Sequence, residues 1–189
     1  MSPRIGLNKE MILEAAAVLA DEEGIHSVTL ASLSKKLNVR PPSLYNHIEG
    51  LNGIRRELAL FGLTSLYEEM AAAIQGAKKE EAVRRMAKAY MRFAKNRPGL
   101  YDATFVPKDG DKRIEEAGGK IVRLVLSVLK AYHLDADAAI HAVRGLRSIL
   151  HGFAGLRQNN AFGLPYDIEE SLDRTIRAYL IGLDIYQDK

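Results

Sequence analysis

A short stretch near the N-terminus, RPPSLYNHIEG from Arg40 to Gly50, gathers side chains that can hydrogen-bond to nucleic acid. Asn can pair with adenine through two hydrogen bonds, Arg can reach guanine, and Ser accepts from or donates to several bases. Tyr and His bind backbone phosphates more readily, and such contacts fix the register of a protein on DNA without reading sequence. These residue types therefore favour recognition of double-stranded DNA.

The spacing of the stretch divides these two kinds of contact among its residues. Leu44 and Ile48 take the inward positions of a short helix, which leaves the polar residues exposed. We expect base contacts from Arg40, Ser43 and Asn46, and phosphate contacts from Thr29, Tyr45 and His47. The same stretch is also compatible with a structural connector in which Tyr45 or His47 is half-buried.

Three short helices are expected to position this stretch. Asn8 and Thr29 are suitable N-caps for the first and second helix, and Gly24 is a suitable end for the first. Asn38 tolerates the left-handed conformation that a tight turn needs, and Pro41-Pro42 suit the first turn of a third helix. Two short helices joined in this way are typical of a helix-turn-helix, whose second helix enters the major groove. The inward residues expected in the first two helices are Ile12, Ala16, Leu19, Ala20, Leu33 and Leu37.

Helical periodicity continues to the C-terminus, and strand signals are nearly absent. A fourth helix is expected from about residue 52 to 75, followed by a bundle with a break at Pro98. Asp135 and Asp167 are suitable caps for its last two helices. We therefore predict an all-α protein with a helix-turn-helix DNA-binding domain over residues 1–52 and a larger helical domain over residues 53–189, whose expected roles, effector binding and dimerisation, depend on the features described below.

The composition limits the class of protein. With 47% hydrophobic residues among 189, the chain can bury a substantial core, and the lack of cysteine excludes disulfides and thiolate metal sites. No apolar run approaches membrane-spanning length, so we expect a soluble cytoplasmic protein with no membrane partner. The net charge of +3 is small, but basic residues outnumber acidic ones between Thr29 and Arg56.

The N-terminal third resembles the DNA-binding domain of the TetR family of bacterial transcription regulators. The segments that carry the resemblance are ILEAAAVLADEEG, VTLASLSKKLNV and above all PPSLYNHI. The resemblance implies that Thr29, Tyr45 and His47 touch phosphates. It also implies that the residues nearest the bases are Arg40, Pro42, Ser43 and Asn46.

The chain departs from the family pattern at the start of the fourth helix. The family often has a Lys there that reaches a phosphate, and this chain has Leu51. Asn52 and the backbone N–H groups of the helix start are expected to substitute for it. Arg55 and Arg56 follow one turn later, and Ser34 replaces the alanine that is usual inside the second helix.

The last third resembles a subgroup of TetR-like effector domains that has a Trp-His-Gly signature. Here the signature reads Leu150-His151-Gly152, within LRSILHGFAGL. Small and apolar residues at steps of three and four predict a helical seam that pairs with a second copy of the chain, and an internal core face is the alternative. The predicted interface residues are Ala142, Gly145, Ile149, Gly152, Leu156, Leu172, Ile176, Tyr179, Leu183 and Tyr186.

A pocket for a small-molecule effector is a further hypothesis. Polar residues at helical steps and aromatic residues in the middle of the chain are its candidate lining, although solvent exposure and ordinary core packing explain the same pattern. No Walker loop, nucleophile elbow or zinc-protease motif occurs, so we predict no catalytic residue, metal or cofactor. The candidate lining residues are Tyr90, Phe93, Tyr101, Phe105, Arg144, Arg147 and His151.

Together these features predict a ligand-responsive repressor that binds a palindromic operator as a homodimer in the bacterial cytoplasm, associated with the nucleoid. A TetR-like activator is one alternative. The other is a helical dimer that binds a ligand or protein and has no DNA function.

Overall fold

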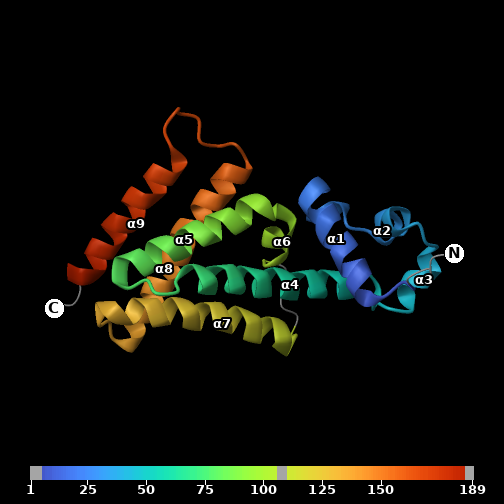
Figure 1. Ribbon diagram of the computed structural model, residues 1–189, viewed down its shortest axis with the longest axis horizontal. Helices are drawn as coiled ribbons and strands as arrows, with labels where there is room; N and C mark the ends of the chain where they lie inside the picture. The colour runs from blue at the N-terminus through green and yellow to red at the C-terminus, as the bar shows by residue number, and fades with distance from the viewer. Residues whose placement is uncertain (1–5, 106–109, 186–189) are drawn as a thin grey trace. The chain divides into compact units, whose positions relative to one another are not determined.

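Helices account for all regular structure that the computed structural model describes, which covers residues 6–105 and 110–185 (Figure 1). This confirms the predicted all-α class. None of these helices is both long and apolar enough to cross a membrane. The elements are α1 (Lys9–Glu23), η1 (Ile25–Ser27), α2 (Leu30–Leu37), α3 (Pro41–Tyr45), α4 (Gly50–Ala73), α5 (Lys79–Asn96), α6 (Pro98–Ala103), α7 (Lys112–Leu129), η2 (Lys130–Tyr132), α8 (Ala136–Gln158) and α9 (Ile168–Ile185).

The chain forms two compact units, each built from two segments of the sequence. The first contains Met1–Thr64 and Asn96–Glu116, and the second contains Ser65–Lys95 and Ala117–Lys189. The expected boundary between residues 52 and 53 falls inside α4, which is one continuous helix from Gly50 to Ala73. Helix α6 joins the first unit because it packs on α1.

The caps predicted for the N-terminal helices are confirmed. The Asn8 side chain accepts a hydrogen bond of 2.8 Å from the backbone N–H of Met11, and Gly24 ends α1 with a φ of 87°. Thr29 and Ser32 cap α2 reciprocally, each side chain accepting from the other's backbone N–H. Asn38 follows α2 in the left-handed conformation, with a φ of 52°. These caps set both ends of the helix that precedes α3.

Helix α3 begins at the two prolines, as the sequence predicts. Leu44 has no exposed surface and anchors the short helix on its neighbours. The inward residues predicted for α1 are all buried, and in α2 Leu33 is buried while Leu37 is half-buried. The buried apolar residues of the first unit include Ile12, Ala16, Ala20, Val28, Leu33, Leu44, Ile54 and Leu58.

Helix α6 is attached to the C-terminal part of α1 through Asp21. One carboxylate oxygen of Asp21 accepts hydrogen bonds from the backbone N–H groups of Gly99 (2.9 Å) and Leu100 (3.1 Å), and the other pairs with Nε of Arg97 at 2.6 Å. The residue that precedes α6 makes no side-chain cap of its own, so Asp21 acts as the cap from a distant helix. A Cβ on Gly99 would lie 2.1 Å from the carbonyl carbon of Ala20, so only glycine permits this close approach.

The second unit contains α8 and α9, which pack on each other. The Tyr179 hydroxyl donates a 2.6 Å hydrogen bond to the carbonyl oxygen of Ala142. Gly145 leaves room for this ring, because a Cβ there would lie 2.8 Å from the Tyr179 hydroxyl oxygen. Asp135 and Asp167 cap the two helices, which confirms both predicted caps.

Candidate nucleic-acid interface

The surface of α3 presents the residues expected to read DNA bases. Arg40, Pro42 and Asn46 are exposed, and Ser43 is half-buried. Because Leu44 between them is fully buried, the backbone of α3 is fixed while its polar side chains remain accessible. A rigid short helix with exposed hydrogen-bonding groups is the arrangement that major-groove reading requires.

The residues expected to contact phosphates lie around α3 and are all exposed. Tyr45 exposes 59% of its surface, and His47 and Asn52 are also accessible. Thr29 is exposed too, but its hydroxyl already accepts a hydrogen bond from the Ser32 backbone N–H at 3.0 Å. The Thr29 hydroxyl therefore has a structural role as a helix cap.

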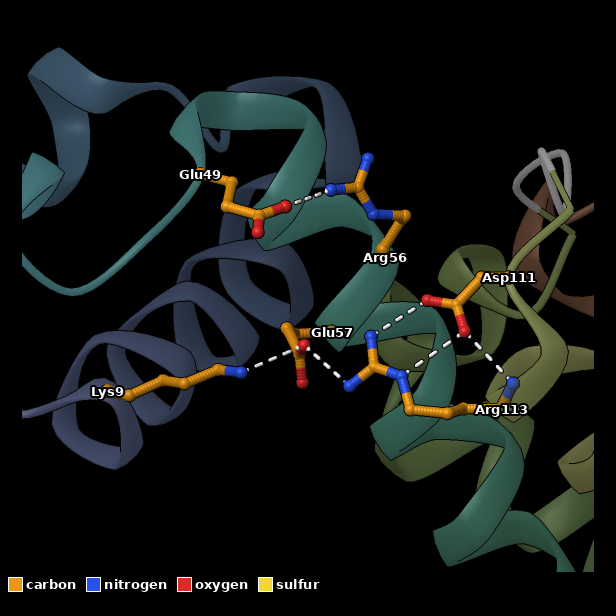
Figure 2. Close-up of polar contacts among 6 residues, drawn as sticks. All are labelled: Lys9, Glu49, Arg56, Glu57, Asp111 and Arg113. Atoms are coloured by element: carbon orange, nitrogen blue, oxygen red, sulfur yellow. Dashed lines mark hydrogen bonds and ion pairs between the residues drawn. The ribbon is translucent and has the colours of Figure 1, made fainter.

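The start of α4 contains an ion pair that sequence reasoning did not predict. The Glu49 carboxylate lies 2.7 Å from a guanidinium nitrogen of Arg56, two helical turns further along the chain (Figure 2). Leu51, where the family often has Lys, is half-buried. An open cavity of about 570 Å³ beside the pair has His47 in its lining. Glu49 directly precedes α4, which begins at Gly50, so helical spacing gave no signal of this pair.

A second charged cluster lies on the same cavity and centres on Glu57. Its carboxylate pairs with Lys9 of α1 at 2.9 Å and with Arg113 of α7 at 3.0 Å (Figure 2). Arg113 also pairs with Asp111 at 2.8 Å. Partial burial raises the pKa of Glu57, but the hydrogen bonds from Lys9 and Arg113 outweigh it, and the net pKa is below its usual value. The hydrogen bonds with Arg113 likewise lower the pKa of Asp111. Residues so distant in sequence gave no signal of this cluster.

Comparison with known proteins identifies the family of this fold. Residues 12–47 match the family described as bacterial regulatory proteins, tetR family, and residues 83–179 match the tetracyclin repressor-like C-terminal domain. The uncharacterized HTH-type transcriptional regulator YobS of Bacillus subtilis (strain 168) is 51% identical over 184 residues, covering 97% of this chain and 96% of that protein. The chain belongs to the TetR family.

Solved structures show the same TetR-family fold. A protein of unknown function from Rhodococcus sp. RHA1 has a TM-score of 0.81 at 18% identity, over 97% of this chain and 100% of that chain. A TetR variant from Acinetobacter baumannii AYE in complex with minocycline has a TM-score of 0.71 at 17% identity, over 96% of this chain and 98% of that chain. The protein is thus a TetR-family helix-turn-helix DNA-binding transcriptional regulator, and this family is not enzymatic.

The residues predicted to pair two TetR-family subunits are divided between the interior and the surface of the second unit. The first group lies where helices α8 and α9 of one chain pack on each other. The buried members are Ala142, Leu172, Ile176 and Leu183, and Gly145, Ile149 and Tyr179 are half-buried. Gly152 and Leu156 are exposed, and Tyr186 lies outside the described residues.

The residues predicted to line an effector pocket are not brought together around one of the two cavities described for this chain. Tyr90 and Phe93 are buried in the second unit, whereas Tyr101 and Phe105 belong to the first, where their rings make an edge-to-face contact of 5.1 Å. The remaining three, Arg144, Arg147 and His151, are exposed on α8. None of the seven lines the cavity beside α4 or a second, about 430 Å³ in volume, at the start of α5. No cluster of three or more potential metal ligands occurs within the described ranges.

Proposed function

We propose that this regulator is a homodimeric, ligand-responsive repressor that binds a palindromic operator in the bacterial cytoplasm. The observation that carries the DNA-binding part is the exposed polar surface of α3 around the buried Leu44. One such helix reads few base pairs, and two copies about one helical turn apart supply a longer site. A palindromic operator follows from the two-fold symmetry of such a dimer.

The proposal assigns base reading to Arg40, Pro42, Ser43 and Asn46 and phosphate binding to Tyr45, His47 and Asn52, with Thr29 as a secondary phosphate contact. Binding by fluorescence anisotropy to an operator selected from genome fragments, and to scrambled DNA, tests the assignment. We expect Asn46→Ala to lose about 10-fold affinity for the operator and to relax its sequence preference. Tyr45→Phe should weaken binding to all sequences about equally. Equal losses on every sequence from both changes would refute base reading by Asn46.

The proposed dimer face uses the exposed apolar residues of α8 and α9. Leu156 exposes 46% of its surface, and Ile181 and Ile185 expose 54% and 62%. Exposed apolar residues in this number on neighbouring helices favour burial by a partner, and Gly152 leaves open space for its close approach. Ile181→Glu should therefore shift sedimentation from dimer to monomer, whereas Val122→Glu, an exposed apolar position on α7, should not. A monomeric wild-type protein would refute the dimer.

The proposed response to a small molecule is a shift between two populations of the dimer. A ligand that binds better to the form with unsuitably spaced α3 helices lowers operator affinity by its differential affinity for that form. The minocycline complex of the TetR variant with the same fold supports a small-molecule effector.

We also place the C-terminal domain in the subgroup with the Trp-His-Gly signature, at Leu150-His151-Gly152. A reporter gene behind the operator should be expressed more strongly when the protein is deleted, and lower expression would indicate an activator.

A further inference from the structure

We propose that Arg56 binds a DNA phosphate in the operator complex and that its guanidinium forms an ion pair with Glu49 in the free protein. The Glu49–Arg56 pair then acts as an electrostatic gate, in which an internal carboxylate holds the place of the phosphate until DNA displaces it. This inference rests on the proposed DNA-binding surface and adds a contact to it.

The position of the pair places it beside the expected phosphate contacts. Arg56 and Glu49 line the same cavity as His47, and Glu49 follows His47 by two residues in the chain. Leu51 supplies no charge at the start of α4, whereas Arg56 reaches back from the second turn to Glu49, which directly precedes the helix. Lys9, Arg56 and Arg113 all line the cavity, and of these three Arg56 forms the ion pair with Glu49 (Figure 2).

Gly53 makes room for the Glu49 side chain of the pair. A Cβ at this position would lie 3.0 Å from the Cβ of Glu49 and 4.0 Å from a guanidinium nitrogen of Arg56. Glycine inside a helix lowers its stability relative to alanine, because it has more conformational freedom to lose on folding. The close contact is with the Glu49 Cβ, so glycine in the first turn of α4 leaves room for the Glu49 side chain.

The exposure of the carboxylates distinguishes Arg56 from the other two cations of the cavity. Lys9 and Arg113 share Glu57, whose side chain is only 18% exposed and whose pKa is lowered by both of them. The Glu49 side chain is 85% exposed, so water competes for it and the pair contributes little to stability. Arg56 is therefore the cation that can change partner at the lowest cost.

The exchange is chemically matched. A guanidinium donates two parallel hydrogen bonds to phosphate oxygens as readily as to a carboxylate. The displaced Glu49 carboxylate is then surrounded by water. This costs little, because the Glu49 side chain is already 85% exposed in the free protein. Each phosphate neutralised by a cation also releases a counterion from the DNA, and the affinity then falls more steeply with salt.

A double-mutant cycle tests the gate. Operator and scrambled DNA are titrated at four salt concentrations with wild-type protein, Arg56→Gln, Glu49→Gln and the double variant. We expect Arg56→Gln to weaken binding to both DNAs by about 5-fold and to reduce the slope of log K against log salt by about 0.9. Glu49→Gln should strengthen binding by about 3-fold, because Arg56 no longer has an internal partner. In the Arg56→Gln background, Glu49→Gln should change the logarithm of the binding constant by less than half as much.

Two results would overturn the inference. An unchanged salt slope in Arg56→Gln would mean that Arg56 meets no phosphate. An equal gain from Glu49→Gln with and without Arg56 would mean that Glu49 only repels DNA. Arg85→Gln, which breaks an exposed ion pair with Glu81 on α5, is the matched control and should change neither affinity nor slope. Circular dichroism melts establish that the variants are folded. A wild-type protein that binds no DNA would refute the proposed function as well, whereas specific wild-type binding with an unaffected Arg56→Gln would refute the gate alone.

Discussion

Asp21→Ala should release α6 from α1. The substitution removes the acceptor for the backbone N–H groups of Gly99 and Leu100 and the ionic partner of Arg97. The loss of a helix cap costs about 1 kcal/mol. A hydrogen bond between charged groups adds about 1.5 kcal/mol, which is reduced here because 36% of the Arg97 side chain is exposed. The expected loss is about 2 kcal/mol in the free energy that holds α6 in place.

Amide hydrogen exchange measures this loss locally, which matters because two compact units need not unfold together. The Gly99 and Leu100 amides should exchange about 30-fold faster in Asp21→Ala, the ratio that corresponds to 2 kcal/mol. Asp21→Asn keeps an acceptor for the amides but loses the charge and the second oxygen that pairs with Arg97, so it should show about half of the effect in free energy. Unchanged exchange at both amides in Asp21→Ala would refute the capping role.

Three further changes test the packing and charge of the two units. Ser34→Ala should leave the free energy of unfolding unchanged or raise it by about 1 kcal/mol in urea titrations, because the buried Ser34 hydroxyl has no hydrogen-bond partner among the described residues. The pKa of Glu57 is lowered in the folded protein, so its contribution to stability is complete above its usual pKa of 4.5 and is lost as the pH falls through the lower folded value. Glu57→Gln should therefore flatten the dependence of the melting temperature on pH in this acid range. An unchanged dependence would contradict the role of the Glu57 ion pairs. Gly145→Ala gains helix propensity but crowds the Tyr179 hydroxyl. Its effect on the free energy of unfolding should therefore be more favourable by about 1 kcal/mol in a Tyr179→Phe background than in the wild-type protein. Additive effects of the two changes in urea unfolding would argue against the close contact.

Local features of the sequence predicted the N-terminal helices well. Asn8 and Thr29 are caps whose bonding partners lie three residues away, and Asn38 adopts the left-handed turn that its side chain tolerates. The prolines of α3 act on the backbone of their own turn. Such signals are complete within a few residues, which is why the elements that present the DNA-binding residues could be placed from the sequence.

Contacts between distant segments could not be predicted in the same way. Asp21 meets Gly99, and Glu57 meets Lys9 and Arg113, through the tertiary packing of helices that lie far apart in the chain. The apolar stripe on α8 and α9 was ambiguous for a related reason. Helical periodicity shows that a face is apolar, but it cannot show whether the same chain or a second copy covers it. The buried Leu172 and the exposed Ile181 lie nine residues apart on the same helix.

The attachment of α6 to α1 limits how this regulator can be recombined with others. A hybrid that joins its DNA-binding segment to a foreign sensing domain at residue 52 would separate Asp21 and Ala20 from Gly99. The foreign α6 would then meet α1 without a matched cap, and any side chain at the glycine position would collide with the Ala20 backbone. A working hybrid has to transplant residues 96–116 together with the N-terminal segment, or reproduce the aspartate and the glycine on the two sides of the junction.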